Sequence, residues 1–511
     1  MMKGIIIFIE SDSIYASQKA FDGKSAVDLS YEWAKKLEMD ICTISEKLSV
    51  LSALEEMFDI CEKNAANYAV ISYNDVPFTN LSVTKKLIEN HIEYKAEYTF
   101  SDGYPYGFTP EIIDKGTLKI LIGMLKNQGE NKENNSPLAR NFLYELIKKD
   151  INSFEVETVL SESDWRLFRF SFCTEKKENF IACKELYEKI ISKSENELTA
   201  DKIVEKASML PSILKTVPGF YNLQICSYEE KSIYSPYYNE YKNKYSENPS
   251  KEKCSFMKFE AIKKLIKEIA ELSENAVVSL SAFGEAFCHP QIIEIIEEII
   301  KYKGLCVFIE TNGLLINQEI AEKLAELYKK YPSQKNFFEK IMIAVKLDSF
   351  SKETYNIIHP ESCETDFETA VTAINLLKNA LPGCVYPQFV RMQQNEEELE
   401  KFFRYWNENN SGKLIIQKYD DYAGLLPQYK VADLSPLERN VCWHIRRDMT
   451  VLINGDVPVC HSCIFSDCVG NVFENSLDSV WKKLDDFVVQ HINGNYCQKC
   501  RNCDEYYTFN F

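Results

Sequence analysis

Residues 442–463 read CWHIRRDMTVLINGDVPVCHSC, and they open the stretch that decides how the whole chain is interpreted. Of the 17 cysteines, seven lie in the last seventy residues. The first two stand in a C-x12-G-x4-C arrangement around Gly455, and the last three form C-x2-C-x2-C. Thiolates are the ligands of iron–sulfur clusters and of structural zinc. We therefore predict a metal site built from Cys442, Cys460, Cys463, Cys468, Cys497, Cys500 and Cys503.

Composition narrows the class of protein. A length of 511 residues predicts two to four domains. The net charge of −18 argues against binding to nucleic acid or to anionic membranes. The apolar run Ile5–Ile9 is too short for a signal peptide, and no run of about 20 apolar residues predicts a membrane helix. We expect a cytoplasmic protein whose thiols stay reduced, so metal binding is favoured over a disulfide framework.

Strands and helices alternate along residues 1–195. Apolar runs predict strands at Lys3–Glu10 and Tyr68–Tyr73, and a helical period covers Lys24–Lys36. Later apolar runs predict strands at Glu155–Leu160 and Leu167–Phe172. The polar stretch 127–137 is typical of a surface loop. This alternation predicts an α/β domain with a parallel sheet.

A second alternating block spans residues 196–440. Its predicted strands are Tyr221–Ile225, Val277–Ser281, Cys306–Glu310, Ile341–Leu347 and Val385–Met392. Helical stretches separate these strands, and the repetition predicts a full or partial β/α barrel. Residues 441–511 form a third, cysteine-rich domain of short elements.

The last domain resembles the SPASM domain that follows the barrel in many radical S-adenosylmethionine (SAM) enzymes. The match rests on TVLINGDVPVC ending at Cys460, GNV from Gly470, SLDSVW ending at Trp481, and the closing cysteines. Asn454-Gly455 suits a two-residue type I′ hairpin between two strands. The resemblance implies a [4Fe–4S] cluster, and zinc is the alternative. We expect Cys442, Cys460, Cys497 and Cys500 as the core ligands. A second cluster would need a ligand from outside the seven cysteines.

The middle block resembles the radical SAM barrel itself. The matching stretches are SLSAFGE, ending at Glu285, then FIETNG and VKLDS. The resemblance implies a SAM site that includes Gly284, Glu285, Asn312 and Asp348. The family's C-x3-C-x2-C triad is missing.

The place of that triad is NLQICSYEEKSIYSPYY, where Cys226 ends the strand. Ser232 and Ser235 stand near the other two cysteine positions. Serine oxygen is a poor substitute for thiolate on an iron–sulfur cluster. The sequence therefore predicts a degenerate barrel in which SAM chemistry is in question.

The first domain resembles nucleotide-sugar cytidylyltransferases of the GT-A type, through AVISYNDVPFTN and DGYPYGFTPEII. The resemblance implies that Asp75 holds Mg²⁺ on nucleotide phosphates and that Lys24 closes the phosphate loop. The first loop departs from the pattern, since Glu10 and Asp12 would repel a triphosphate. Transferase activity and Mg²⁺ binding are therefore in doubt for this chain.

Taken in order, the three resemblances identify the chain as a member of the spiro-SPASM family. We expect an iron–sulfur protein whose degenerate barrel binds a peptide, sugar or nucleotide. The alternative is an active enzyme, of radical SAM or cytidylyltransferase type, that modifies a peptide or a surface glycan precursor.

Overall fold

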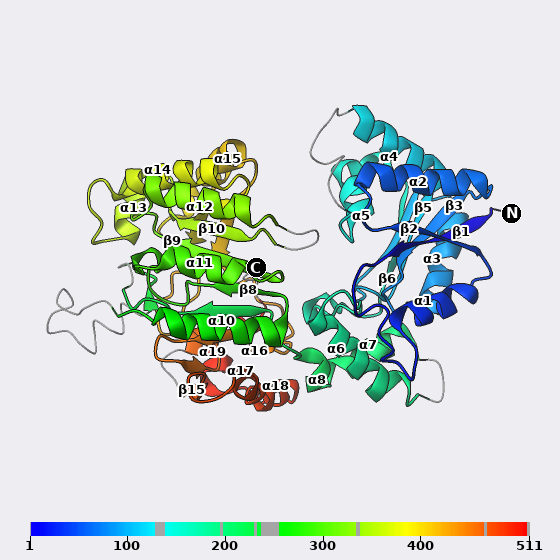
Figure 1. Ribbon diagram of the computed structural model, residues 1–511. Coiled ribbons are helices and arrows are strands. Elements are labelled where there is room, and N and C mark those ends of the chain that lie inside the picture. Colours follow the sequence, from blue (N-terminus) through cyan, green and yellow to red (C-terminus); the bar gives the residue numbers. More distant parts are fainter. Residues whose placement is uncertain are drawn as a thin grey trace. The chain divides into compact units, whose positions relative to one another are not determined.

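A computed structural model describes residues 2–127, 138–194, 198–228, 232–236, 255–333, 338–463 and 468–507. The chain divides into two compact units, Met1–Thr216 and Val217–Phe511 (Figure 1). The predicted loop at 127–137 lies, apart from Asn127, outside the described residues. The three predicted domain ranges, 1–195, 196–440 and 441–511, stay predictions. Within the described ranges, every helix is too short or too polar to span a lipid bilayer.

The first unit is built on a six-stranded sheet in the order β2-β1-β3-β5-β4-β6. Its strands are β1 (Gly4–Glu10), β2 (Asp40–Ser45), β3 (Tyr68–Tyr73), β4 (Tyr98–Asp102), β5 (Glu111–Asp114) and β6 (Val156–Leu160). The predicted parallel sheet is confirmed, with one strand, β5, running antiparallel to both neighbours.

Helices cover both faces of this sheet (Figure 1). The helices near the sheet are α1 (Ala26–Lys35), α2 (Val50–Lys63), α3 (Leu81–Glu93), α4 (Lys115–Asn127) and α5 (Phe142–Ile147). A further group, α6 (Lys177–Leu186), α7 (Ala200–Ser208) and α8 (Pro211–Leu214), packs together beside them. Side chains alternate along β1, so Ile7 packs with α2 and α4 while Phe8 contacts Tyr31 of α1. Burial on both faces explains the unbroken apolar run of this strand.

One predicted strand of the first unit is wrong. Residues Arg166–Phe168 form a 3-10 turn, and Leu167–Phe172 contributes only a single bridge, from Ser171 to Tyr106. The aromatic side chains there pack on one another instead, with Phe168 and Phe170 stacked at 5.6 Å. Apolar content alone could not distinguish this stacked turn from a buried strand.

The second unit contains a seven-stranded, all-parallel sheet in the order β12-β11-β10-β9-β8-β7-β13, which is an open barrel. Its strands are β7 (Phe220–Leu223), β8 (Ala276–Ser279), β9 (Leu305–Thr311), β10 (Ile341–Lys346), β11 (Val385–Arg391), β12 (Ile415–Lys418) and β13 (Asp448–Val451). The predicted partial β/α barrel is confirmed, and all five predicted strands are present.

The barrel helices lie along the outside of this sheet (Figure 1). They are α10 (Phe259–Ser273), α11 (Ile292–Ile300), α12 (Gln318–Lys330), α13 (Lys352–Ile358), α14 (Asp366–Ala380) and α15 (Leu399–Asn409). The inner face carries an apolar layer that includes Phe308 and Ala344. The side chains two residues further along the same strands, Glu310 and Lys346, line a cavity at the carboxyl end of the sheet.

The cysteine-rich segment is joined to the barrel sheet. Its strand β13 pairs in parallel with β7, while β14 (Asp456–Pro458) pairs with β15 (Cys468–Asn471). The remaining helices are α16 (His444–Arg447), α17 (Leu477–Lys482), α18 (Asp485–Ile492) and α19 (Gln498–Asn502).

The chain reverses direction at the predicted Asn454-Gly455 turn. The Gly455 N–H donates to the Leu452 carbonyl at 2.8 Å, and the Leu452 N–H donates to the Asp456 carbonyl at 2.8 Å. Beyond these two bonds, the flanking strands β13 and β14 pair within different sheets. Gly455 has φ +88°, whereas Asn454 is not among the described residues with positive φ, so the turn is not type I′.

Candidate functional site

The C-terminal cysteines lie on three short pieces of backbone. Cys442 lies just before α16. Cys460 and Cys463 share one turn, closed by the Cys463 N–H donating to the Cys460 carbonyl at 3.0 Å. At the start of α19, the sulfur of Cys497 accepts the Cys500 N–H at 3.5 Å.

Thiols from these pieces act on one another. The pKa of Cys460 is raised well above its ordinary value, first by Cys463, then by burial, and further by Cys503. Burial is the first cause of the raised pKa of Cys500, and thiols outside its own helix, Cys463 and Cys442, add to it. Such effects place the thiols in one neighbourhood of the second unit. The gathered set is Cys442, Cys460, Cys463, Cys497, Cys500 and Cys503.

The surroundings of this set contain hydrogen-bond donors to sulfur, and its role as the ligand set of an iron–sulfur cluster stays a prediction. Burial raises the pKa of Cys442 to about 11, while the backbone N–H groups of Ile445 and His444 act in the opposite direction. The sulfur of Cys503 accepts the N–H of Glu505 at 3.4 Å. Backbone donors aimed at sulfur stabilise thiolates that a metal has deprotonated. The six thiols could thus hold a cluster with outer hydrogen bonds in place.

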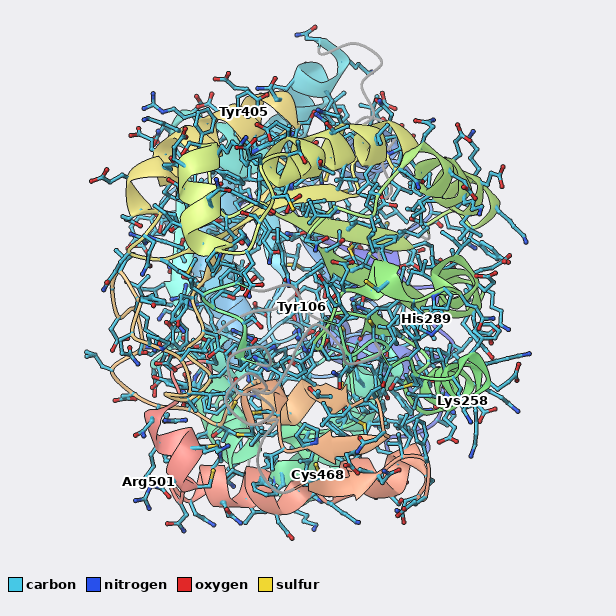
Figure 2. All side chains as sticks on the ribbon, turned by 90° about the vertical axis from the view of Figure 1, so that its left-hand side faces the viewer. Tyr106, Lys258, His289, Tyr405, Cys468 and Arg501 are labelled. Atoms are coloured by element: carbon cyan, nitrogen blue, oxygen red, sulfur yellow. The ribbon has the colours of Figure 1, made fainter. Side chains whose placement is uncertain are left out.

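Among the described residues, no three Cys, His, Asp or Glu side chains meet closely enough to hold a metal ion. The choice between an iron–sulfur cluster and zinc at these cysteines stays a prediction. Cys468, the seventh predicted ligand, is exposed at the start of β15 (Figure 2). Its role as a ligand stays a prediction.

A polar cavity of about 100 Å³ lies at the carboxyl ends of the barrel strands. Three of the four predicted SAM-site residues, Gly284, Glu285 and Asn312, line it. Glu285 is buried, and its carboxylate accepts the N–H of Asn312 at 3.0 Å and the hydroxyl of Thr311 at 2.9 Å. Burial raises the pKa of Glu285, and these hydrogen bonds oppose the rise.

Gly284 is required where it stands. Its φ is +89°, and a Cβ atom would lie 2.1 Å from the carbonyl oxygen of Cys226. Only glycine lets the loop after β8 pack against the segment after β7 that carries Cys226. The loop and the predicted cluster position are therefore held together by backbone contact.

Asp348, the fourth predicted residue, is placed differently. It is fully buried and is not among the described residues that line the cavity. Its carboxylate accepts the Tyr234 hydroxyl at 2.6 Å and the Val390 N–H at 2.7 Å, and His359 lies 3.5 Å away. These contacts give Asp348 a positioning role, because they fix the segment that carries Tyr234 over β10 and β11.

The structure also describes part of the segment in which the cysteine triad is expected. Cys226 follows β7, and its sulfur accepts the Tyr228 N–H at 3.4 Å. Ser232 and Ser235 are buried and line the cavity, near the two positions where the sequence pattern expects thiolates. The described part of this segment therefore presents hydroxyls on the cavity wall.

Sequence reasoning missed a polar layer on the inner face. Glu310 of β9, Lys346 of β10, Gln388 of β11 and Gln417 of β12 all line the cavity. The Gln388 amide donates to Glu310 at 2.6 Å and also to Gln417. Each follows an apolar inner residue by two positions, so strand alternation was the signal that could have found them.

The end of β12 links this cavity to the cysteines. Lys418 and Asp420 both line the cavity. Lys418 pairs with Asp504 at 3.0 Å, one residue beyond Cys503. Asp420 accepts from the Ser462 hydroxyl at 3.1 Å, one residue before Cys463. The predicted metal centre and the barrel cavity therefore share one wall.

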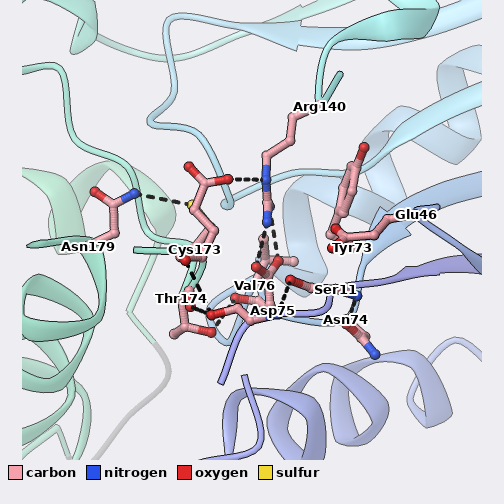
Figure 3. Close-up of polar contacts among 12 residues, drawn as sticks. Ser11, Glu46, Tyr73, Asn74, Asp75, Val76, Arg140, Cys173, Thr174 and Asn179 are labelled. Carbon is pink, nitrogen blue, oxygen red and sulfur yellow. Dashed lines mark hydrogen bonds and ion pairs between the residues drawn. The ribbon is translucent and has the colours of Figure 1, made fainter. Parts of the chain in front are cut away.

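The two nucleotide-site residues predicted in the first unit do not form a phosphate site. Lys24 is half exposed and pairs with Glu32 at 2.8 Å. Asp75 is fully buried behind Arg140, which pairs with both of its carboxylate oxygens (Figure 3).

Comparison with known proteins matches both parts of the second unit. A model of the radical SAM superfamily matches residues 226–405, and one of the SPASM iron–sulfur cluster-binding domain matches residues 442–504. An uncharacterized protein of Treponema pallidum (strain Nichols) is 37% identical over 375 residues, which are 72% of this chain and 99% of that relative.

Solved structures give weaker matches. Streptococcus suis SuiB bound to precursor peptide SuiA has 14% identity and a TM-score of 0.42, over 68% of this chain and 88% of SuiB. Native anSMEcpe with bound AdoMet has 15% identity and a TM-score of 0.40, over 56% and 91%. A cytidylyltransferase from Leptospira borgpetersenii serovar Hardjo-bovis has 13% identity and a TM-score of 0.33, over 42% and 97%. All three scores are too low to say more than that the chains are distantly similar.

Proposed function

The chain belongs to the family of radical SAM proteins that carry a C-terminal SPASM domain, and from this we propose an iron–sulfur protein that binds its ligand without making a radical. The two domains imply [4Fe–4S] clusters. One observation supports the finer proposal, namely that Ser232 and Ser235 line the cavity near the positions where the family's thiolates are expected.

The C-terminal cysteines would hold the remaining cluster. Cys442, Cys460, Cys497 and Cys500 are the proposed core ligands, and Cys463 and Cys503, which influence Cys460 and Cys500, are further candidates. Such a cluster, when bound, supplies one-electron transfer. A reducing compartment keeps these thiols available, so we place the protein in the cytoplasm.

The chemistry of the barrel cavity indicates its ligand. Carboxylates (Glu285, Glu310) and ammonium groups (Lys346, Lys418) line the same small space. Groups of both signs suit a zwitterion, which carries an amine and a carboxylate. Of a peptide, a sugar and a nucleotide, a peptide terminus or a free amino acid fits best. We propose no nucleic-acid partner, since the chain carries a net charge of −18.

A second candidate is an active radical SAM enzyme. Its support is the retained loop, in which Gly284 packs on Cys226 and Glu285 meets Asn312. Methionine, the amino-acid part of SAM, is itself a zwitterion, so the same cavity would serve it. In this alternative, Cys226 and non-cysteine ligands complete the radical cluster.

Anaerobic reconstitution separates the two candidates. We expect iron and sulfide in the proportion of one cluster per chain, little zinc, and an electron paramagnetic resonance spectrum that SAM leaves unchanged. Reductive cleavage of SAM to 5′-deoxyadenosine, above the level of a Cys226→Ala control, would establish the enzyme instead. Zinc without sulfide would refute both iron–sulfur candidates.

A further inference from the structure

The first unit holds a second cavity that the iron–sulfur chemistry does not use. It has a volume of about 430 Å³ and lies beside the carboxyl end of β3. Its wall includes Arg140 but, among the described residues that line it, not Asp75. The side chain that a nucleotide-binding site would present to a metal is therefore covered by a guanidinium.

Arg140 satisfies Asp75 completely. Its Nη1 lies 2.9 Å from Oδ1 and its Nη2 lies 2.5 Å from Oδ2, a bidentate pair (Figure 3). The backbone carbonyl of Asp75 accepts the Thr174 N–H at 2.9 Å, which fixes the residue in place. Mg²⁺ needs the oxygens that Arg140 already holds, so the residues present do not fit a Mg²⁺–nucleotide.

A second carboxylate completes the arrangement. Glu175 Oε2 lies 2.5 Å from Arg140 Nε, so one guanidinium joins two carboxylates. Burial alone would lower the pKa of Arg140, but Tyr106 and Asp75 raise it well above its ordinary value. Arg140 is therefore a permanent cation in the position where a divalent ion would otherwise join two carboxylates.

The cations of the cavity wall are already paired. Arg140 lies 4.5 Å from the ring centre of Tyr73 and 5.7 Å from that of Tyr106, in addition to its two carboxylates. Arg166, also on this wall, pairs with Asp102 at 3.2 Å and with Asp164 at 2.7 Å. A neutral ligand binds without breaking these ion pairs.

The remaining wall suits hydroxyl groups. Aromatic faces alternate with Ser72, Ser101 and Thr109, and the last two hydroxyls lie 2.5 Å apart. Burial raises the pKa of Glu111 to about 7, so this carboxyl can donate or accept a hydrogen bond at neutral pH. Aromatic faces combined with mixed donors and acceptors match the apolar faces and polar edges of a sugar ring.

We infer that this cavity is a metal-independent binding site for a neutral sugar, in which Arg140 replaces the divalent cation and Tyr106 provides a stacking face. Tyr106 is 38% exposed, so its ring is accessible to a ligand. The inference is independent of the cluster and of the barrel cavity.

Binding of Mn²⁺, without any nucleotide, tests whether Arg140 replaces a divalent cation beside Asp75. Electron paramagnetic resonance of the full chain should show the same bound Mn²⁺ in the native protein and in Asp75→Asn. Arg140→Ala should gain one site that the double variant Arg140→Ala/Asp75→Asn lacks. A native site that Asp75→Asn abolishes would overturn the inference. Circular dichroism checks that each variant is folded. A second variant, Glu175→Gln, should bind the same amount of Mn²⁺ as the native protein.

Saturation-transfer NMR tests whether the protein binds a neutral sugar. The probes are the methyl glycosides of glucose, galactose, mannose and N-acetylglucosamine, each with EDTA present. We expect at least one to bind, and Tyr106→Ala to weaken it by about tenfold or more, in line with the loss of a ring contact. Tyr94→Ala, which removes an exposed tyrosine at the end of α3, is the control. Absence of binding by all four, or CTP binding that requires Mg²⁺, would overturn the assignment.

Discussion

The first strand region of the barrel and the C-terminal segment differ in the number of cysteines that they bring together. After β7 comes Cys226, and Ser232 and Ser235 line the cavity near the places where the sequence pattern expects two more cysteines. At the C-terminus, six cysteines from three pieces of backbone influence one another. Among the described residues, the cavity is lined by hydroxyl, amide and charged groups, and it shares Lys418 and Asp420 with the cysteine-rich segment.

The largest effect is expected from removing a thiolate at the C-terminal centre. Cys500→Ser should lose most of the bound iron and destabilise the second unit, because structural metal sites contribute on the order of 10 kcal/mol to folding. Iron analysis and thermal unfolding after anaerobic purification give the result. Cys468→Ser, at an exposed position, is the matched control and should keep its iron. Equal loss in both would mean that the ligand set is different.

The next largest effect concerns the buried ion pair of the first unit. Arg140→Ala leaves Asp75 buried without its cation and should cost about 3–5 kcal/mol in the free energy of unfolding. Urea unfolding followed by circular dichroism measures it. Arg166→Ala removes an exposed pair with Asp102 and should cost about 0–1 kcal/mol. Similar costs for the two variants would contradict the special role of Arg140.

A smaller effect is expected over the barrel. Tyr234→Phe removes the hydroxyl that donates to buried Asp348 and should cost about 1–3 kcal/mol. If this contact positions the cavity wall, binding of an amino-acid probe should weaken along with stability. Tyr405→Phe, at an exposed site on α15, is the control. Unchanged stability in Tyr234→Phe would show that Val390 and His359 suffice to hold Asp348.

The smallest effect is a pH dependence in the first unit. The pKa of Glu111 is raised from 4.5 to about 7 in the folded chain, first by burial, so folding favours its protonated form. Its contribution to stability is therefore complete below about pH 4.5 and is lost as the pH rises through about 7. Urea unfolding across this range should show a fall in stability that Glu111→Gln removes. The same slope in both proteins would assign the dependence to another group.

Much of the fold could be predicted from local pattern. Strong apolar runs located β1, β3 and the five central barrel strands, because strands buried on both faces have a distinct composition. The edge strand β12 was missed, since it is only four residues long. The strand at β13 was predicted as one arm of a hairpin, but its pairing with β7, far away in the chain, was not. Edge position is a property of tertiary structure that the local sequence does not carry.

Site residues could be predicted where a short local motif is typical of one kind of chemistry. The cysteine spacing identified a metal centre, and Gly284, Glu285 and Asn312 do line the barrel cavity. The roles of Asp75 and Asp348 depend on partners that no local motif contains. Arg140 lies 65 residues from Asp75, and Tyr234 lies 114 residues from Asp348. A carboxylate at a strand end therefore predicts where a site lies in the sheet. Whether that carboxylate can bind a ligand depends on the side chain that pairs with it, which is distant in the sequence.

The pairing of β13 with β7 has a consequence for biosynthesis. Phe220 is matched with Asp448, so the first barrel strand waits for its neighbour until nearly the whole second unit has left the ribosome. Until then β7 is an unprotected sheet edge, which is a template for aggregation. A nascent chain that stalls or is truncated before β13 should therefore depend on chaperones, and metal loading of the late cysteines would follow the closing of that edge.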